Sequence, residues 1–521
     1  MKLKHALRFG LPLLVIGLML VTAGAAFAQD GQPPDNATLA AASSDTVVSL
    51  NVMWLMLAGF LVFFMQAGFA LVETGFTRAK NVSHTMMMNM MVFCIGAIGY
   101  WLTGFALQFG GINYTYPALG NMGAWAFSPV SLGNWVGSTG ITLLDKPLLI
   151  GGSGVMGLSG FLLGGLGANF GVLSFFLFQM VFMDTAATIP TGSMAERLKF
   201  IGFVLMGLWV SMFIYPLVGN WVWGGGWLAN LGRTMGWGNG AVDFAGSGVV
   251  HMIGGSLGLA GAIVLGPRIG RFNKDGTANA IPGHNIALGV LGTIILFFGW
   301  FGFNPGSSLG FTGGLRNLAV LAAINTLLAG AAGGCSAMAY IWLFGPAKKP
   351  DAGMSVNGIL AGLVAITAPC AFVDPTAAVI IGLIAGVIVC LASVWLEKAK
   401  IDDPVGAVPV HFANGLWGVL AVGIFANGNP DTALWNGVES PVTGLLYGGG
   451  TQILAQLAEV IAIAVTVIGL SLVFFTILKR LGLLRVSAAD ELAGLDIPEM
   501  GASGYPKDWE PSLEALPKGV T

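Results

Sequence analysis

Long apolar windows alternate with short polar connections through most of the chain. Windows long enough to cross a hydrocarbon core of about 30 Å begin beyond Val47. There are eleven, near 47–75, 82–107, 171–194, 200–223, 245–266, 285–303, 317–345, 354–373, 376–396, 407–426 and 452–478. Several contain Gly or Pro, which membrane helix bundles tolerate when neighbouring helices satisfy the freed backbone groups. The pattern predicts an all-α polytopic membrane protein with eleven transmembrane helices.

The composition agrees with a membrane protein. Hydrophobic residues make up 55% of the 521 residues and charged residues 9%, whereas a soluble domain carries about 25% charged residues. The net charge of −2 gives no reason to expect nucleic acid as a partner. The four cysteines show no metal-ligand spacing, and no Walker A, HExxH or nucleophile motif is present. We therefore expect no metal, no cofactor and no enzyme activity.

The N-terminal region has the organisation of a secretory signal. Basic residues precede the apolar run from Leu11 to Val21, and Ala26-Phe27-Ala28 fits a cleavage site. An uncleaved first helix is the alternative. The predicted organisation is a signal peptide at 1–28, a polar lead at 29–46, a membrane domain at 47–480 and a polar C-terminal tail at 481–521.

Basic residues are distributed unevenly between the two sides of the predicted membrane domain. With the mature N-terminus outside, the inner connections and the tail hold sixteen Lys and Arg, and the outer connections hold three. The positive-inside rule then predicts an N-out, C-in protein of the cytoplasmic membrane. This count requires residues 108–170, including 154-GVMGLSGFLLGGLG-167, to be an extracellular connection and not a span.

One pattern occurs twice inside the apolar windows. Asp243 and His251, like Asp403 and His411, fit D-x7-H-x3-G-x2-G, and the two copies are 160 residues apart. They fall five windows apart and would enter the membrane from opposite faces, which is typical of an inverted-topology repeat. Eight helical residues advance about 12 Å. We therefore predict an inverted five-plus-five repeat with one final helix, in which the two histidines meet near the middle of the membrane.

A histidine inside a membrane is a functional candidate, although hydrogen bonding to a backbone carbonyl is a structural alternative for either one. Two facing imidazoles can share one proton, with one ring donating and the other accepting. Asp243 and Asp403 are predicted to have structural roles as caps of backbone N–H groups at the starts of their helices.

Five segments carry a family resemblance: 73-ETGFTRAKN-81, 195-AERLKF-200, 243-DFAGSGVVH-251, 300-WFGFNPGSS-308 and 484-LRVSAADELAGLD-496. On these motifs the chain resembles the ammonium transporter (Amt/Mep/Rh) family, in its bacterial and archaeal branch, from about residue 47 to about 505 outside the 108–170 connection. The resemblance implies a homotrimer with one pore per subunit and a twin-histidine pore that matches His251 and His411.

The resemblance also implies roles for individual residues. Phe178, Phe182, Trp223 and Ser307 match the outer site that binds the cation, and Phe182 is also the outer gate. Phe303 and Thr367 match pore-lining positions. Aromatic faces attract a cation and a hydroxyl accepts one of its N–H bonds, so we expect ammonium capture, proton loss near the two phenylalanines and passage of ammonia. Asp184 departs from the family pattern, and its spacing from Phe182 turns it about 200° around the helix, away from the pore.

The expected partners are ammonium or ammonia, with methylammonium as an analogue, the lipid bilayer, and a PII-type signalling protein on the cytoplasmic face. Arg485, Glu491, Gly494 and Asp496 match the family's tail motif. Three other functions stay open: an ammonium sensor with little flux, an Rh-like channel for neutral gas, and a haem-binding redox subunit that uses His251 and His411 as ligands.

Overall fold

The computed structural model describes residues 36–110, 148–150, 153–158, 160–163, 170–435 and 438–505. The predicted signal peptide lies outside these residues. The chain divides into two compact units, residues 1–49 and 50–521. In the first unit, residues 36–49 are helical and form the beginning of helix α2 (Asn36–Phe76). The predicted polar lead is thus helical from Asn36 onward, which its alanine-rich sequence favours.

Ten helical segments of the described chain are long and apolar enough to cross a membrane. They are α2; Ala79–Phe109 (η1 Ala79–Asn81, α3 Val82–Gly99, η2 Tyr100–Gly104, α4 Phe105–Phe109); α7 (Phe170–Ser193); Phe200–Val222 (α8 Phe200–Trp209, η5 Val210–Ile214, α9 Tyr215–Val222); Ser247–Leu265 (η6 Ser247–Met252, α11 Ile253–Leu265); α12 (Ile286–Gly306); α13 (Gly314–Phe344); α15 (Pro375–Lys398); Val408–Phe425 (η7 Val408–Ala413, α16 Asn414–Phe425); and α17 (Gln452–Arg480). A shorter apolar helix, α14 (Ala352–Ile366), corresponds to the eighth predicted window, 354–373.

The 108–170 connection contains β structure that the sequence analysis did not predict. Strands β1 (Leu148–Ile150) and β2 (Ser153–Met156) form an antiparallel hairpin with Ile150 opposite Ser153. Gly154 also forms a parallel bridge to Gly226, and a short 3₁₀ turn, η4, follows at Phe161–Leu163. The described residues of the 154–167 run contain β2 and η4 and no helix long enough to span a membrane.

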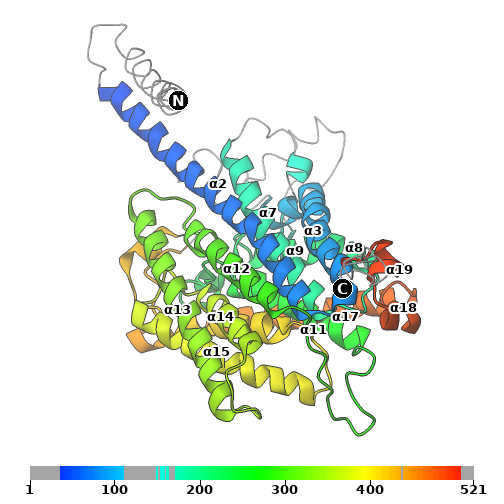
Figure 1. Cartoon of the computed structure of the whole chain (residues 1–521). Helices are drawn as coiled ribbons and strands as arrows, with labels where there is room; N and C mark the ends of the chain where they lie inside the picture. Colours follow the sequence, from blue (N-terminus) through cyan, green and yellow to red (C-terminus); the bar gives the residue numbers. More distant parts are fainter. Residues whose placement is uncertain are drawn as a thin grey trace, which may run out of the picture. The chain divides into compact units, whose positions relative to one another are not determined.

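Small residues bring helices α13, α14 and α15 together (Figure 1). A Cβ atom on Gly362 of α14 would lie 2.2 Å from the backbone oxygen of Ala329 on α13. A Cβ atom on Gly382 of α15 would lie 2.3 Å from the same oxygen. Such contacts are closer than any side chain permits, and they follow from the reliance of membrane helices on close packing of small residues.

The remaining short elements lie in the connections and the tail. They are α10 (Leu231–Met235), η8 (Pro430–Leu434), η9 (Leu445–Tyr447), α18 (Ala488–Ala493) and α19 (Asp496–Met500). Large apolar side chains are exposed on the spanning helices, for example Phe64 on α2, Trp395 on α15 and Val465 on α17. This apolar exterior is what a helix surface in contact with lipid or another membrane subunit requires.

Candidate functional site

Each repeated aspartate holds the start of its helix. The two carboxylate oxygens of Asp243 accept hydrogen bonds from the backbone N–H groups of residues 246, 247, 248 and 249, at 2.8–3.0 Å. Asp403 accepts from the N–H groups of Gly406 (3.0 Å) and Val408 (2.7 Å). Both carboxylates thus satisfy N–H groups that have no partner within the helix.

The two histidines follow in matched segments. His251 lies in η6 and His411 in η7, and both segments are π-helical before an α-helix continues. The eight residues from Asp243 to His251 are therefore not uniformly α-helical, whereas the predicted advance of about 12 Å assumed an α-helix throughout. The imidazoles nevertheless meet: the two Nδ1 atoms are 3.2 Å apart, and the ring centroids are 5.2 Å apart at an angle of 22°.

The glycines of the repeated pattern let the two histidine segments cross. A Cβ atom on Gly255, four residues after His251, would lie 2.3 Å from the backbone nitrogen of Phe412 in η7. A Cβ atom on Gly415, four residues after His411, would lie 2.5 Å from the backbone oxygen of Ser247 in η6. Each helix therefore contacts the π-helical segment of the other copy through its own glycine, a reciprocal arrangement that gives the H-x3-G spacing a physical reason.

A small cavity lies beyond the N-terminal side of η6. It is lined by Phe178, Gln179, Phe182, Trp223, Phe244, Ser307, Leu309 and Trp435. The structure thus brings together the four residues that the resemblance assigned to the cation site, and it adds Phe244 and Trp435. Trp435 lies in the polar connection 427-NGNPDTALWNG-437, where an isolated tryptophan was the one available signal. We call this region the aromatic end.

Hydrogen bonds fix the two indole rings of the aromatic end. Trp223 donates from Nε1 to the backbone oxygen of Asp243 (2.7 Å), and Trp435 donates from Nε1 to the backbone oxygen of Ser307 (2.9 Å). The Ser307 hydroxyl donates to the backbone oxygen of Phe303 (3.0 Å) and keeps its lone pairs for an N–H donor. The cavity is therefore bounded by ring faces and hydroxyl oxygen, a combination suited to a small cation that bears N–H groups.

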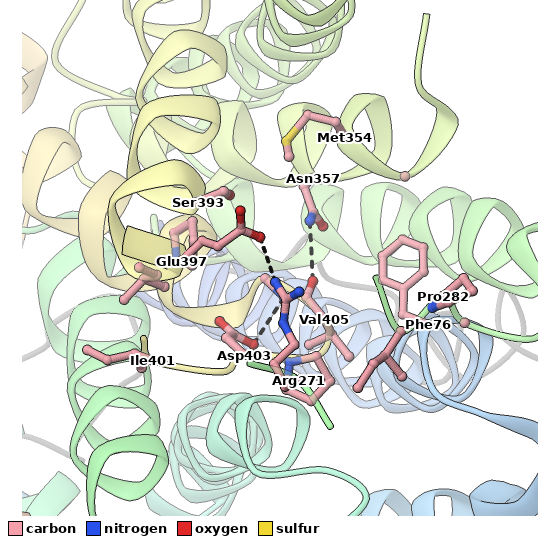
Figure 2. A pocket seen from close by; sticks show the side chains of 17 residues that line it. Phe76, Arg271, Pro282, Met354, Asn357, Ser393, Glu397, Ile401, Asp403 and Val405 are labelled. Atoms are coloured by element: carbon pink, nitrogen blue, oxygen red, sulfur yellow. Dashed lines mark hydrogen bonds and ion pairs between the residues drawn. The ribbon is translucent and has the colours of Figure 1, made fainter. Parts of the chain in front are cut away.

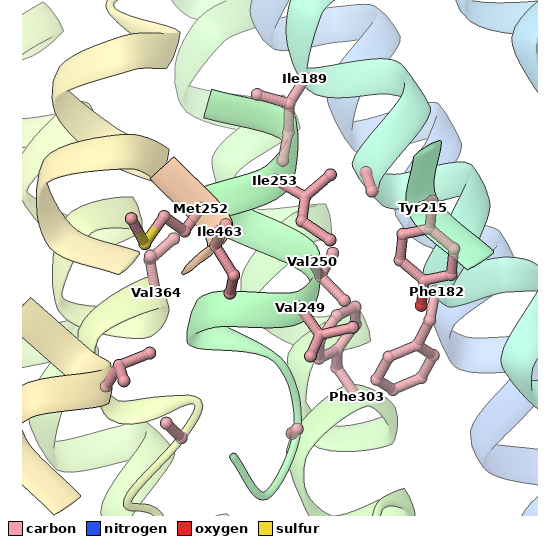
Figure 3. Packing of buried hydrophobic residues seen from close by; sticks show 14 of the residues in the cluster. Phe182, Ile189, Tyr215, Val249, Val250, Met252, Ile253, Phe303, Val364 and Ile463 are labelled. Atoms are coloured by element: carbon pink, nitrogen blue, oxygen red, sulfur yellow. The ribbon is translucent and has the colours of Figure 1, made fainter. Parts of the chain in front are cut away.

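Two stacked phenylalanines separate the aromatic end from the histidines. The rings of Phe182 and Phe303 have centroids 4.0 Å apart at an angle of 23°, and Figure 3 shows them side by side near η6. Phe303 also contacts His251, with centroids 5.5 Å apart. These contacts order the elements from the cavity through the phenylalanine pair to the histidine pair.

Thr367 lies behind Trp300. Its hydroxyl accepts a hydrogen bond from the Trp300 indole (3.0 Å), and the Trp300 ring stacks on His251 with centroids 5.2 Å apart. The resemblance implied a pore-lining threonine. In the structure Thr367 reaches His251 through Trp300.

Ion pairs lie near the start of the second histidine segment, around Asp402. Arg268 binds Asp402 through Nε (2.8 Å) and Glu196 through Nη1 (3.3 Å), and all three side chains are buried. Burial acts to raise the pKa of Asp402, but its hydrogen bonds to Arg268 and the positive charge of Arg197 outweigh that effect and lower this pKa to about 2. Burial also acts to raise the pKa of Glu196, and Arg268 with Arg78 lowers it. We call this region the charged end.

A larger cavity of about 320 Å³ opens at the charged end (Figure 2). Its lining includes Arg271, Asn357, Glu397 and Asp403. Arg271 binds Glu397 at 2.7 Å, and Asn357 donates to the backbone oxygen of Val405 at 3.2 Å. Asp403 and Pro409 in its lining place this cavity beside the start of the helical segment that carries His411.

The C-terminal tail binds the connections at the charged end. Arg485 pairs with Glu491 at 2.7 Å and donates to the backbone oxygens of Leu265 and Pro267. Asp496 accepts from the backbone N–H of His84, and α18 and α19 lie near α8 (Figure 1). The four matched tail residues therefore include three that hold the tail against its own chain.

Gly494, the fourth, has φ +104°. A Cβ atom there would lie 2.6 Å from the backbone oxygen of Lys80. Both the backbone conformation and the close approach require glycine.

Three buried carboxyl groups were missed or left unexplained by the sequence. Glu73 accepts hydrogen bonds from Asn89 and Thr191, and Glu459 accepts one from the Gln456 amide at 3.2 Å. Asp184 shares one face of α7 with Thr188 and Thr191, whose hydroxyls bind Gln66 and Glu73 of α2. Asp184 thus lies on a helix-packing face, and its Oδ1 has no hydrogen-bond partner in the described structure.

Within the described residues no group of three or more His, Cys, Asp or Glu side chains is arranged to hold a metal ion. The signal for the buried carboxyl groups was their position inside apolar windows, because a carboxyl group in a membrane needs a partner.

Comparison with known proteins places this arrangement in a family. The model of the Ammonium Transporter Family matches residues 53–505. The chain is 43% identical over 503 residues to the ammonium transporter Amt2 of Archaeoglobus fulgidus, across 96% of this chain and 95% of the relative. It is 35% identical over 480 residues to ammonium transporter 1 member 3 of Solanum lycopersicum, across 89% of this chain and 95% of the relative.

Solved structures give the same result. A sensor Amt protein matches with a TM-score of 0.72 and 35% identity, across 88% of this chain and 99% of that protein. Mep2 of Candida albicans matches with a TM-score of 0.67 and 25% identity, across 91% of this chain and 95% of that protein. The relatives are transporters of ammonium and not enzymes, and the chain belongs to the ammonium transporter family.

Proposed function

We propose that the protein carries ammonium nitrogen across the cytoplasmic membrane, with the aromatic end outside and with ammonia as the species that passes the histidines. The observation that carries this proposal is the order of the elements along one path: the aromatic cavity, the Phe182–Phe303 stack and the His251–His411 pair. A cation site, a dry constriction and a neutral polar pair follow one another in the order that capture, proton loss and passage require.

Capture takes place at the aromatic end. Ammonium carries one positive charge and four N–H donors, while the cavity offers the faces of Trp223 and Phe178 and the hydroxyl oxygen of Ser307. Cation–π attraction contributes about 0.5–2 kcal/mol, more as water is excluded. Because no carboxylate lines this cavity among the described residues, the cation is attracted without being held by an opposite charge.

Proton loss takes place at the phenylalanine stack, where a charged species would lose its hydration. Ammonia has no charge and crosses an apolar constriction at much lower cost. The histidine pair then provides one N–H donor and one acceptor, depending on the tautomers of the two rings. A polar station of this kind stabilises ammonia within the otherwise apolar path.

The test is current and uptake in proteoliposomes, with ammonium compared to potassium. We expect the wild type to respond to ammonium and not to potassium. The double variant His251→Ala/His411→Ala should lose the selective current by roughly 100-fold, the lower end of what positioned proton-transfer groups contribute. His284→Ala, which removes an imidazole bound to Thr77 and Tyr505, is the matched control. Unchanged selective currents in the double variant would defeat a proton relay through the histidines.

A sensor is the second candidate function. The observation that favours it is the similarity to the sensor Amt protein, together with a tail that binds several inner connections. Uptake of labelled methylammonium into vesicles separates the two functions, since a sensor binds the analogue with little accumulation. A flux that is independent of membrane potential would instead favour an Rh-like gas channel, and the visible absorption of the purified protein tests haem binding.

Assembly and orientation belong to the same proposal. We place the mature N-terminus outside and the C-terminus in the cytoplasm, where Arg268, Arg485 and the other basic residues of the charged end agree with the positive-inside rule. The exposed apolar faces of the spanning helices suit a homotrimer. A tail bound beside the charged end suits regulation by a PII-type protein. Cross-linking in native membranes and co-purification with a PII protein test these two assignments.

A further inference from the structure

A third cavity, which we call the His411 cavity, lies beside His411 on the side of the charged end. The space open to the centre of a water molecule measures about 20 Å³, which is enough for one water. Apolar side chains line most of it, including Phe69, Ile189 and Leu296, and the polar side chains that reach it are Glu73, Asn357 and His411. A cavity with three polar partners and the volume of one water is a suitable place for a bridging molecule.

His411 is the histidine that opens toward this cavity. His411 is 5% exposed, whereas His251 is fully buried and its Nε2 has no hydrogen-bond partner in the described structure. The Nδ1 atoms of the two rings face each other, so the Nε2 atom of His411 is the nitrogen that can bond to a group outside the pair. A hydrogen-bonded path from the histidine pair toward the charged end therefore begins at His411.

Glu73 is a carboxyl group without a cationic partner. Its two oxygens accept from the Thr191 hydroxyl (both 2.9 Å), and Oε2 also accepts from the Asn89 amide (2.8 Å). Among the described residues no Lys or Arg forms an ion pair with it, and the charged group that acts on it is Asp403, of the same sign. A buried carboxyl group in such surroundings carries a proton or takes a cation from the transport path.

The His411 cavity adjoins the cavity of about 320 Å³ at the charged end. Asn357, Val405 and Gly406 line both, and Figure 2 shows Asn357 directed at the Val405 backbone at this boundary. Glu73 and His411 therefore line one cavity with room for a single water, and this cavity borders the larger cavity of the charged end.

We propose that Glu73 is a proton-exchanging residue of the transport path, which receives a proton from the histidine pair across one water and releases it toward the charged end. The inference rests on the proposed function. In the first step an N–H bond of a protonated His411 breaks and the bridging water passes one proton on. An O–H bond then forms on the Glu73 carboxylate, leaving a neutral imidazole and a neutral carboxylic acid. In the second step that O–H bond breaks, the proton passes to water at the Asn357 boundary, and the carboxylate is restored.

The test separates charge movement from nitrogen movement. Ammonium-induced current on a solid-supported membrane and uptake of labelled methylammonium are measured on the full-length protein in proteoliposomes. Glu73→Gln keeps the shape of the side chain and one acceptor oxygen but cannot exchange a proton. We expect its current to fall by roughly 100-fold while uptake is retained. Asp184→Asn, which removes a buried carboxyl group that does not line the cavity, is the matched control and is expected to keep both signals.

A second variant guards against misfolding of Glu73→Gln. Asn357→Leu leaves Glu73 and its bonds to Thr191 and Asn89 in place but removes a polar partner of the bridging water, and we expect the current to fall there as well. Normal current in Glu73→Gln overturns the inference, whether or not Asn357→Leu loses current. If Glu73→Gln does not fold, normal current in Asn357→Leu overturns it. A wild type without ammonium-dependent current or uptake would instead contradict the proposed function.

Discussion

The aromatic end and the charged end of the pore differ in how their polar atoms are used. At the aromatic end, the indole N–H groups of Trp223 and Trp435 are bound to backbone oxygens, and ring faces remain for a ligand. At the charged end, Arg268 is bound to Asp402 and Glu196, so these charges neutralise one another. One end can attract a cation through neutral groups, while the charges of the other hold inner connections together.

The difference teaches that a cluster of charges does not by itself identify a binding site for a cation. The ion pairs of the charged end connect segments far apart in the sequence, such as Glu196 with Arg268 and Arg485 with Glu491 in the tail. Removing one partner leaves a buried charge, which affects stability. Removing a ring at the aromatic end affects binding. The two ends should therefore respond to mutation in different measurements.

The largest effect is expected from Arg268→Met. The change removes the cation that Asp402 and Glu196 share and leaves these buried carboxylates with Arg271 (3.5 Å) and Arg78 (2.6 Å) as partners, which costs up to about 3–5 kcal/mol. Thermal unfolding and gel-filtration profiles in detergent measure the loss. Arg233→Met is the control, because Arg233 pairs with Glu439 and both side chains are exposed, so its loss should cost under about 1 kcal/mol. Equal destabilisation by the two variants would contradict the assignment of a structural role to Arg268.

Acid should weaken the charged end selectively. The pKa of Asp402 is about 2 in the folded protein against an ordinary value of 3.8, so its carboxylate contributes stability above pH 4 and loses it as the pH falls toward 2. The contribution is about 2 kcal/mol. Unfolding of the detergent-solubilised protein as a function of pH measures it. Asp402→Asn should be less stable at neutral pH but should show a smaller further loss between pH 4 and pH 2.

Trp223→Leu should weaken ammonium binding at the aromatic end. The loss of a cation–π contact worth about 0.5–2 kcal/mol raises the half-saturating ammonium concentration by roughly 2- to 30-fold. Concentration dependence of the ammonium-induced current measures the change. Trp209→Leu removes a ring that stacks on Phe474 away from the cavity and should leave the half-saturating concentration unaltered. An equal change in both variants would remove the argument for a cation site at Trp223.

The smallest effect is expected from Glu439→Gln. Glu439 forms an ion pair with Arg233 near the aromatic end, and both side chains are exposed. Such pairs contribute little to stability. We expect the melting temperature and the half-saturating ammonium concentration to stay the same, as measured by the two assays above. A clear change in either would mean that fixed charge contributes to the aromatic end after all.

The sequence predicted the helices better than the chemistry between them. Hydrophobic windows predicted eleven segments, which correspond to ten long apolar helices and the shorter α14. The length of an apolar run shows whether a helix can cross the membrane, and reading it needs no tertiary context. The repeated Asp-His-Gly pattern predicted the meeting of His251 and His411 for the same reason: it required only spacing and direction. The helical form of residues 36–46 and the β1–β2 hairpin were missed, because short polar or glycine-rich stretches carry weak periodicity.

Partners of buried polar groups could not be read from one sequence. Glu73 lies within a motif, but its contacts with Asn89 and Thr191 come from helices that only the fold brings together. Trp435 reaches the aromatic cavity from the connection before α17. Thr367 was matched to the pore, and its bond to Trp300 shows an indirect contact that a motif does not contain.

The π-helical segments at His251 and His411 also affect how related chains should be aligned. A π turn accommodates one residue more than an α turn. A relative that lacks one residue in either segment could close the turn as an ordinary α-helix, and the helix after it would keep its orientation while the residues inside the former π turn, the histidine among them, would change direction. In such a chain one imidazole would leave its partner although the histidine itself was retained. For this family a gap of one position beside the histidines is thus as informative as a substitution of the histidine.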